Sequence, residues 1–274
     1  MTRVVAALSG GGAKAAAHVG AVRALAEAGL APARYTGTSM GAVIAAGFCA
    51  GLTADDVLAR MVEAGNRGIA RRLLAPFGGI FVKALMRPEP LRRGIETYLP
   101  ARRFGDLRLP LTVTAVDLDS GELVLFGDGG SDAPLLDALM ASCALPVFFP
   151  PVIIGGRRLA DGGLRGVVPL EPALAGQPEL VVAVDIGPGF DELGSAPSPY
   201  PSLLRAHNEA TGILMAANSA LEVARWEQDP SRPRLLYIRP RVEKNATFRM
   251  DHARRYADEG YRATAAALRE GGLG

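Results

Sequence analysis

The chain has 274 residues, of which 49% are hydrophobic and 21% are charged. This balance is typical of a folded globular protein and excludes a disordered one. The net charge is only +2, so we expect no nucleic-acid partner. No internal repeat or linker divides the chain, which predicts a single domain over residues 1–274.

Neither a targeting segment nor a membrane span is predicted. The apolar run Val4–Leu8 is shorter than the roughly 7–15 residues of a secretory signal. Residues 35–54 are uncharged and long enough to span a membrane, but their glycines dilute the hydrophobicity and favour a strand followed by a helix. Cys49 and Cys143 are too few for a disulfide framework and lack metal-site spacing. We therefore expect buried thiols in a cytoplasmic protein, with peripheral contact to a membrane surface left open.

Strands and helices alternate in the first fifty residues. Short runs over 3–8 and 34–38 are typical of buried strands, and helical spacing follows each of them, over 13–28 and 41–50. This order builds right-handed crossovers and a largely parallel sheet. The further expected elements are a helix beginning at Thr53, a helix over 91–98, strands over 109–116 and 122–126, a helix over 134–143, a hairpin over 152–160, a strand over 180–186, a loop over 187–201, a helix over 202–228, a strand over 235–238 and a helix over 251–269.

The segment 68–91 mixes basic side chains with large apolar ones. A segment of this composition can lie on anionic lipid headgroups, which suggests peripheral membrane contact. A buried helical insertion with its arginines in solvent explains the same composition equally well. Both interpretations stay open from the sequence.

A G-x-S-x-G pentapeptide spans Gly37 to Gly41, with Ser39 at its centre and Met40 after it. It lies between a predicted strand and a predicted helix, which is the setting of a nucleophile elbow. Glycines at both flanks suit a turn so sharp that side chains would collide. The N-terminus of the following helix would favour negative charge developing at the serine. The same residues also fit a plain turn in which Ser39 caps the helix.

A second glycine cluster, Gly10, Gly11 and Gly12, joins the first strand to the first helix and is followed by Lys14. Consecutive glycines let backbone amides converge on one point and bind an anion. A dinucleotide site would need another glycine where Ala15 stands, and a Walker loop would need Gly-Lys-Ser/Thr. An oxyanion hole and a plain tight connection remain as interpretations.

Asp161 ends a short strand before Gly162 and Gly163 and is the candidate base for the Ser39 proton. Its apolar neighbours would raise its proton affinity by desolvation. An aspartate before two glycines is also typical of a simple turn. A Ser–Asp–His triad would use His252, which follows in the required order but lies in a polar segment that favours an exposed histidine.

Other polar residues carry weaker signals. Asp117 and Asp119 are spaced as alternate metal ligands, but Gly121 follows them, which favours a turn. His18 lies on the first predicted helix and is expected to pack or cap. The candidate chemistry requires no metal and no other cofactor.

The three motifs together, Gly10–Lys14, Gly37–Gly41 and Asp161–Gly163, resemble those of the patatin-like phospholipase family. Similar segments elsewhere are Thr114–Glu122, Ala141–Pro150 and Phe248–Ala263, so the resemblance covers nearly the whole chain. It implies a three-layer α/β/α sandwich with a mainly parallel central sheet.

The resemblance also implies a lipid acyl hydrolase of the phospholipase A or lysophospholipase type, acting on a lipid or acyl-ester substrate. Ser39 would be the nucleophile and Asp161 the base, with no histidine. The amides of residues 10–12 would hold the oxyanion, and Lys14 would add positive charge. A soluble esterase or thioesterase, and a catalytically weak lipid-binding regulatory protein, are the alternative functions.

Two residues depart from the family pattern. Ala15 stands where a glycine is usual; an alanine in left-handed backbone costs about 1–2 kcal/mol, whereas in a helix it is harmless. Val167 stands where an asparagine is frequent, so a hydrogen bond near Asp161 could be missing. Both changes leave the catalytic groups in place and put the rate in question.

Overall fold

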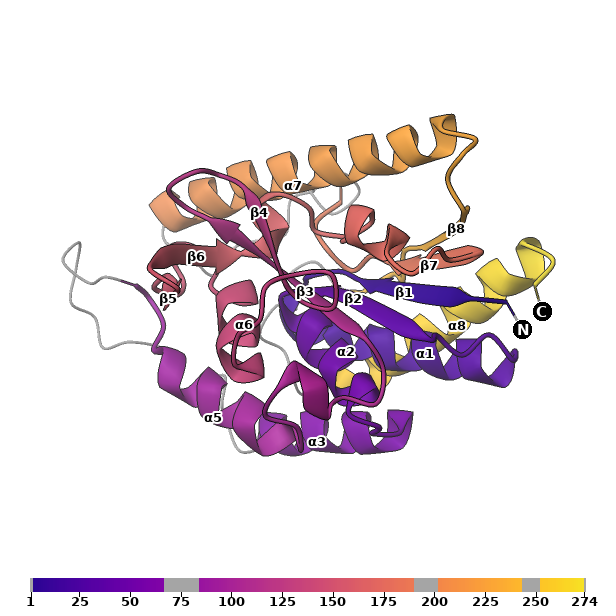
Figure 1. The fold of residues 1–274 in the computed structure, drawn as a ribbon, viewed down its shortest axis with the longest axis horizontal. Helices are drawn as coiled ribbons and strands as arrows, with labels where there is room; N and C mark the ends of the chain where they lie inside the picture. Colours follow the sequence, from indigo (N-terminus) through magenta and orange to yellow (C-terminus); the bar gives the residue numbers. More distant parts are fainter. Residues whose placement is uncertain (1, 67–83, 190–201, 243–251, 274) are drawn as a thin grey trace.

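The computed structural model of the protein describes residues 2–66, 84–189, 202–242 and 252–273. At its centre is an eight-stranded sheet in the order β5-β6-β3-β2-β1-β7-β8, with β4 also paired to β3 (Figure 1). Strand β1 pairs in parallel with β2 and β7, and β3 and β8 extend the parallel part on either side. The strands are β1 (Val4–Leu8), β2 (Arg34–Thr38), β3 (Leu111–Asp117), β4 (Leu123–Gly127), β5 (Val152–Ile154), β6 (Arg157–Asp161), β7 (Leu180–Val184) and β8 (Arg234–Ile238).

Helices cover both faces of the sheet, because alternate residues of a strand point to opposite sides. On β1, Val4, Ala6 and Leu8 belong to the core shared with α1, α2 and α8, whereas Val5 and Ala7 belong to the core shared with α7 (Figure 1). The predicted three-layer α/β/α sandwich is confirmed. The helices are α1 (Ala16–Glu27), α2 (Met40–Cys49), α3 (Ala54–Asn66), α5 (Pro88–Tyr98), α6 (Leu135–Ser142), α7 (Ser202–Gln228) and α8 (Ala253–Glu270), with 3-10 turns η1 (Gly12–Ala15), η3 (Phe104–Asp106), η4 (Gly162–Leu164) and η5 (Glu171–Leu174).

One edge of the sheet is antiparallel. Strands β4 and β6 both pair with β3 in the antiparallel sense, β4 along most of its length and β6 at its end. The hairpin between β5 and β6 turns through Gly155 and Gly156, whose φ angles of 57° and 79° suit glycine. This pairing places Asp161, the last residue of β6, level with Ala115 of β3.

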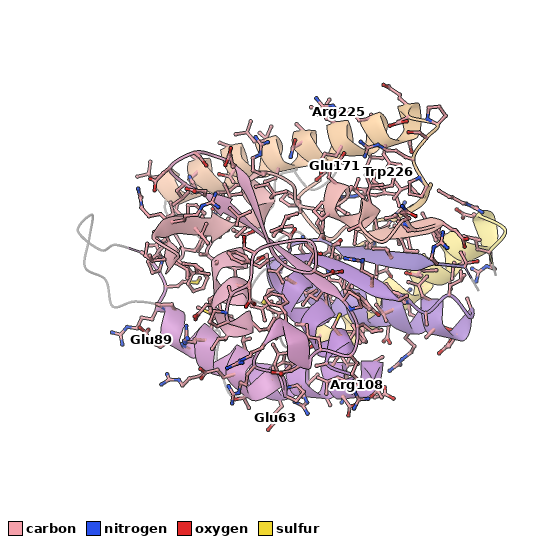
Figure 2. All side chains as sticks on the ribbon, in the orientation of Figure 1. Glu63, Glu89, Arg108, Glu171, Arg225 and Trp226 are labelled. Carbon is pink, nitrogen blue, oxygen red and sulfur yellow. The ribbon has the colours of Figure 1, made fainter. Side chains whose placement is uncertain are left out.

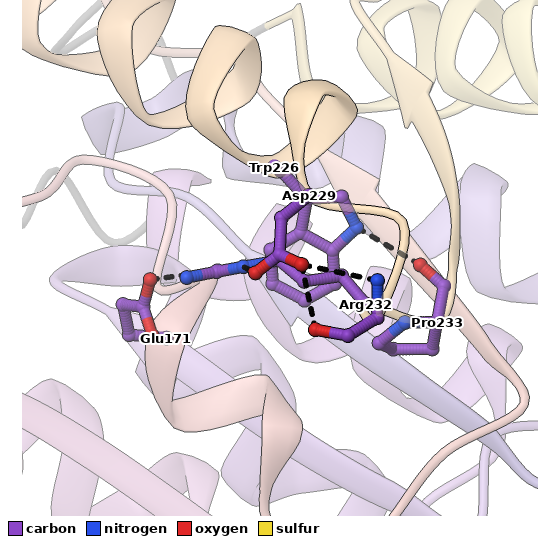
Figure 3. A network of polar contacts seen from close by, with 6 residues as sticks. Glu171, Trp226, Asp229, Arg232 and Pro233 are labelled. Carbon is purple, nitrogen blue, oxygen red and sulfur yellow. Dashed lines mark hydrogen bonds and ion pairs between the residues drawn. The ribbon is translucent and has the colours of Figure 1, made fainter.

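Helix α7 covers the second face of the sheet together with η5. Its Trp226 points toward the sheet (Figure 2), is 3% exposed, and donates its indole N–H to the carbonyl of Pro233 at 2.9 Å. Figure 3 shows the guanidinium of Arg232 beside this ring, bonded to Glu171 of η5 at 2.7 Å and to Asp229 at 3.3 Å. The C-terminal end of α7 is therefore fixed both to η5 and to the connection that enters β8.

Helices α1 and α8 cross in direct backbone contact. A methyl group on Gly20 would lie 1.8 Å from the carbonyl oxygen of Ala257, and one on Gly260 would lie 1.9 Å from that of Ala17. Both distances are far inside van der Waals contact, so this crossing requires glycine at both positions.

The segment 68–91 lies largely outside the described residues, which resume at residue 84. There, Leu85 and Met86 donate backbone hydrogen bonds to the carbonyls of Val147 and Phe148, at 2.9 and 2.8 Å. Met86 and Phe148 are buried in one apolar cluster. This end of the segment packs against the chain, and membrane contact by the rest stays a prediction.

Residues 35–54 form β2 and α2, as the glycine content predicted. Within the described part of the chain, no helix combines the length and the apolar character that a membrane span needs. Cys49 and Cys143 are both free and buried, as expected. Most of the predicted loop 187–201 falls outside the described residues.

Candidate active site

Ser39 lies in a strained turn between β2 and α2. Its backbone has φ 54° and ψ −131°, a conformation rarely adopted by a residue with a side chain. A methyl group on Gly37 would lie 2.4 Å from the Cα of Ala42, and one on Gly41 would lie 2.3 Å from the carbonyl oxygen of Ser9. Close backbone packing therefore requires both flanking glycines, as the sharp turn predicted.

The hydroxyl of Ser39 does not cap the helix that follows it. It lies instead close enough to the Asp161 carboxylate to lower the pKa of that group. The side chain is half-buried and therefore open to a ligand. The interpretation of Ser39 as a plain helix cap is wrong, because its hydroxyl lies beside the Asp161 carboxylate instead of bonding to the helix N-terminus.

The register of three strands brings these two side chains together. Thr38 at the end of β2 is level with Thr114 of β3, and the next residue of β3, Ala115, is level with Asp161. The elbow and the aspartate therefore follow neighbouring strand positions and lie at the same edge of the sheet. This proximity depends on the antiparallel placement of β6, which chain order alone does not reveal.

The carboxylate of Asp161 is buried and oriented. It is 5% exposed, and its Oδ1 accepts the backbone N–H of Gly163 at 2.8 Å. A methyl group on Gly162 would lie 2.2 Å from the Oγ1 of Thr114, so this glycine lets the turn close against β3. Burial raises the pKa of Asp161 from its usual 3.8 to about 6, while hydrogen bonds from Gly163 and Ser39 act in the opposite direction. A carboxylate that titrates near neutral pH is suited to act as a general base.

Replacing this aspartate with asparagine is expected to stabilise the fold at neutral pH. The folded-state pKa is raised above 3.8, so the ionised side chain disfavours folding increasingly as pH rises from about 4 to about 6. We expect Asp161→Asn to unfold with a free energy higher than wild type by at most about 3 kcal/mol above pH 7, shrinking toward zero near pH 4. Urea unfolding of both proteins at pH 4, 6 and 8 measures this difference. A constant difference at all three pH values would contradict the burial argument.

The glycine loop lies beside Ser39 because β1 and β2 are neighbours in the sheet. A methyl group on Gly10 would lie 3.2 Å from the Cβ of Ser39. The backbone N–H of Gly10, however, donates to the carbonyl of Val167 at 3.1 Å. The prediction that all three amides of this loop face an oxyanion is therefore corrected for Gly10, whose amide is engaged.

Gly11 and Gly12 remain as candidate oxyanion donors. Both are half-buried, and neither of their N–H groups donates a hydrogen bond to another of the described residues. Gly12 has a φ of 63°, and a methyl group on Gly11 would lie 2.9 Å from the carbonyl oxygen of Ile186. Unengaged amides in such a turn form a concavity that suits a developing negative charge.

Buried polar residues that sequence reasoning did not assign to the site hold the glycine loop in place. The Oγ of Ser9 donates to the carbonyl of Gly10 at 3.1 Å and accepts the N–H of Ile186 at 2.8 Å. The Nε2 of His18 donates to the carbonyl of Ser9 at 2.9 Å. Burial lowers the pKa of His18 to about 4, so it is neutral at pH 7. His18 therefore anchors the glycine loop, which goes beyond the packing or capping role that was expected. Its position on the helix directly after the loop was the sequence feature that pointed to this role.

A second pair of unassigned residues supports the elbow itself. The backbone N–H of Ser39 donates to the Oγ of Ser142 at 2.7 Å, and the thiol of Cys143 lies within hydrogen-bond reach of the Ser39 hydroxyl. Burial raises the pKa of Cys143, which keeps the thiol protonated. Both residues belong to the segment Ala141–Pro150, which sequence reasoning singled out by resemblance without giving it a role.

Comparison with known proteins agrees with this geometry. The family model described as patatin-like phospholipase matches residues 6–174, which is more than half of the chain. The protein belongs to the patatin-like phospholipase family.

Two kinds of match accompany this patatin-like assignment. Uncharacterized NTE family proteins of Mycobacterium bovis and Mycobacterium tuberculosis are 31% identical over 225 residues, covering 80% of this chain and 60% of theirs. A human protein named omega-hydroxyceramide transacylase is 32% identical over 158 residues, covering 56% of this chain and 29% of its own. The crystal structure of VipD from Legionella pneumophila shares the fold, with a TM-score of 0.56, 16% identity, and coverage of 98% of this chain and 67% of that one. The chain thus spans about 60% of the length of the mycobacterial relatives.

The two departures from the patatin-like pattern are accommodated. Ala15 has φ −56° and ψ −16°, which is helical backbone, so an alanine is unstrained there. Val167 is 3% exposed, and its carbonyl accepts the N–H of Gly10, so it supports the glycine loop through its backbone. Lys14 lies buried on η1 directly after the loop. Its contribution of positive charge to the site stays a prediction.

The alternative triad through His252 finds no support. Its ring lies edge-on to Tyr256, with its Nδ1 3.5 Å from the tyrosine hydroxyl. Among the described residues, the groups that shift the pKa of Asp161 are Gly163 and Ser39, and no histidine is among them.

The pair Asp117 and Asp119 forms the turn that was expected instead of a metal site. The Asp117 carboxylate accepts the Nε of Arg157 at 2.7 Å and the N–H of Asp119 at 2.9 Å. The turn ends at Gly121, whose φ is 74°.

Proposed function

We propose that the protein is a serine acyl hydrolase that cleaves carboxylic esters of lipids with a Ser39–Asp161 dyad, in a single catalytic domain. One observation carries the proposal. The hydroxyl of a serine in a strained elbow lies next to a buried carboxylate, and the unengaged amides of Gly11 and Gly12 lie in the adjoining loop.

The first half-reaction forms an acyl-enzyme. Asp161 takes the proton of Ser39 while the Oγ attacks the ester carbonyl carbon. The carbonyl oxygen becomes an oxyanion, which accepts hydrogen bonds from Gly11 and Gly12 and lies near the positive end of the α2 dipole. One such donor is typically worth about 2.7–4 kcal/mol of barrier. The tetrahedral intermediate then expels the alcohol, which receives the proton held by Asp161.

The second half-reaction uses the same groups with water. Asp161 takes a proton from the water as it attacks the acyl carbon, and the oxyanion returns to the same amides. Collapse of this intermediate breaks the bond to Ser39, which regains its proton and releases the carboxylic acid. Because a single carboxylate serves both halves, its orientation by Gly163 matters in each of them.

Lipid esters as substrates are supported by family membership. That water is the acyl acceptor is a separate part of the proposal. An acyl-enzyme can also pass its acyl group to another alcohol, and the human relative is named a transacylase. A soluble esterase acting on monomeric acyl substrates would use the same dyad, so the geometry alone does not separate it from a lipid hydrolase.

Hydrolysis of p-nitrophenyl esters of short and long acyl chains, compared with hydrolysis of phospholipid vesicles, tests the proposal. We expect turnover of the long-chain esters and of the vesicles. An alkyl fluorophosphonate should attach covalently to Ser39, located by peptide mass spectrometry, and should not attach to Ser39→Ala. Turnover of short monomeric esters alone would favour the soluble esterase. Absence of both turnover and labelling would favour the lipid-binding protein.

The rate should follow the ionisation of Asp161. The base acts only as the carboxylate, and its pKa is raised to about 6 by burial. We expect kcat/KM to be level above pH 7 and to fall about tenfold per pH unit well below pH 6. A pH–rate profile with a soluble p-nitrophenyl ester measures this. A profile that stays level down to pH 4.5 would exclude a base with this pKa.

A further inference from the structure

Helix α7 presents an apolar face to solvent. Between residues 210 and 224, all of its exposed side chains are apolar: Ala210, Ile213, Leu214, Ala220 and Leu221. Leu214 is 70% exposed, Leu221 56%, and Leu203 nearer the start of the helix 82%. The outer side of a surface helix normally carries charged and polar residues. An apolar outer face of this length indicates a partner.

The opposite side of the same helix is already occupied. Ser219 and Trp226 are buried, and Asn218 donates to the carbonyl of Arg165. A methyl group on Gly163 would lie 3.5 Å from the Cε of Met215. The helix is therefore seated on the protein by one side, and its apolar outer face is not needed for that packing.

The outer face has the spacing of a helix-pairing seam. Its exposed residues Leu203, Ala210, Leu214 and Leu221, taken with the half-buried His207, Ala217 and Ala224, follow one another in steps of three and four, the pattern that keeps a seam facing a second helix. Large and small side chains largely alternate along it: Leu203, His207, Ala210, Leu214, Ala217, Leu221 and Ala224.

We propose that this face pairs with the same face of a second copy of the chain, with the two α7 helices antiparallel about a two-fold axis. In that arrangement Leu214 lies opposite Ala217 of the second copy, and Leu221 lies opposite Ala210. Each leucine then meets an alanine, and the same contacts recur on the other side of the axis. A two-fold interface requires this self-complementarity.

Charge on the helix favours a protein partner over a lipid surface. Arg205 and Arg225 are outnumbered by Glu209, Glu222 and Glu227, so α7 carries a formal charge of 2 − 3 = −1. Interfacial helices are typically rich in lysine and arginine and place aromatic residues in the lipid. The tryptophan of α7 is instead buried against the sheet (Figure 2).

Sedimentation velocity of the full chain tests the proposal without any substrate, so its outcome is independent of the proposed activity. We expect the wild type to be a dimer at about 50 µM and the double variant Leu214→Glu/Leu221→Glu to be a monomer, with a dissociation constant at least about 100-fold higher. Ile153→Glu is the matched control, because Ile153 is 61% exposed on β5, outside the α7 face. It should remain a dimer, and far-UV circular dichroism at low temperature should show the same helix and strand content for all three proteins, whereas the monomeric double variant should melt at a lower temperature than the two dimers.

Several results would overturn the proposal. A wild type that is monomeric at every concentration, or a double variant that stays dimeric, would exclude this interface. Binding of wild-type monomers to phosphatidylglycerol vesicles, lost in the double variant but not in Ile153→Glu, would assign the face to a membrane instead.

A cysteine scan tests the direction of the two helices. In the antiparallel pair the two copies of residue 217 are offset by about 4.5 Å along the axis, whereas the two copies of residue 210 are offset by about 16 Å. A short bis-maleimide should therefore link Ala217→Cys dimers and leave Ala210→Cys dimers largely unlinked. The native thiols, Cys49 and Cys143, are buried and give no background. Equal linking at both positions would contradict the antiparallel arrangement.

Discussion

Replacing either member of the dyad should abolish ester hydrolysis while leaving the fold intact. Ser39→Ala removes the attacking oxygen, and we expect kcat/KM to fall by at least about 10³-fold. Asp161→Asn should cost a comparable factor, about 10³ to 10⁴, because the amide can still accept the N–H of Gly163 but cannot take the proton of Ser39. Initial rates on a long-chain p-nitrophenyl ester measure both losses. Since both groups act in the same step, the double variant should be no slower than about the worse single one.

The control for this series is His252→Ala. The ring of His252 contacts Tyr256 and takes no part in the arrangement around Asp161. We expect its activity to stay within a factor of about two of wild type, since it lies outside the reacting groups. A loss as large as that of Asp161→Asn, at unchanged melting temperature, would establish a triad and overturn the dyad.

Much of the candidate site was predictable because its residues are concentrated in short motifs. The elbow around Ser39 and the glycine loop are each set by local backbone constraints, and both join a parallel strand to a helix. Neighbouring parallel strands place such connections at the same edge of the sheet. That rule alone predicts the loop beside the elbow, once β1 and β2 are adjacent.

The rest of the site depends on contacts between distant segments. The N–H of Gly10 donates to the carbonyl of Val167, and the N–H of Ile186 donates to the Oγ of Ser9; these pairs are far apart in the chain, and no local pattern encodes their proximity. The same holds for the placement of Asp161, which reaches Ser39 because β6 reverses direction against β3. The Asp-Gly-Gly motif pointed to this aspartate as a candidate, but it did not reveal the strand pairing that brings Asp161 to the serine.

The layer structure was predictable from buried apolar runs, whereas the closeness of its helices was not. A glycine within a helix usually lowers the stability of the helix, because alanine at the same position is more favourable by about 1 kcal/mol. Gly20 and Gly260 have the opposite role, because the backbones of α1 and α8 touch at these residues. This requirement arises between two helices that are far apart in the chain, so the sequence of either helix by itself does not show it.

The crossing of α1 and α8 therefore predicts a reversal of the usual effect of Gly→Ala in a helix. Helix propensity alone would make Gly20→Ala and Gly260→Ala more stable by about 1 kcal/mol. The added methyl groups would lie 1.8 and 1.9 Å from carbonyl oxygens of the facing helix, which must move apart. We expect each variant to lose at least about 3 kcal/mol of unfolding free energy in urea, the upper part of the range for overpacked cores.

Gly105→Ala is the matched control, because it lies in the short turn η3 with no atom within 4 Å of an added methyl group. It should change the unfolding free energy by no more than about 0.5 kcal/mol. The sign of the measurement decides between the two effects. If Gly20→Ala is more stable than wild type, helix propensity dominates and the two helices do not touch. If Gly20→Ala and Gly260→Ala are both destabilised and Gly105→Ala is not, the backbones of α1 and α8 are in contact at these glycines. Since η1 and α1 continue directly from the glycine loop, a shifted α1 should also lower the rate of ester hydrolysis in any Gly20→Ala protein that still folds.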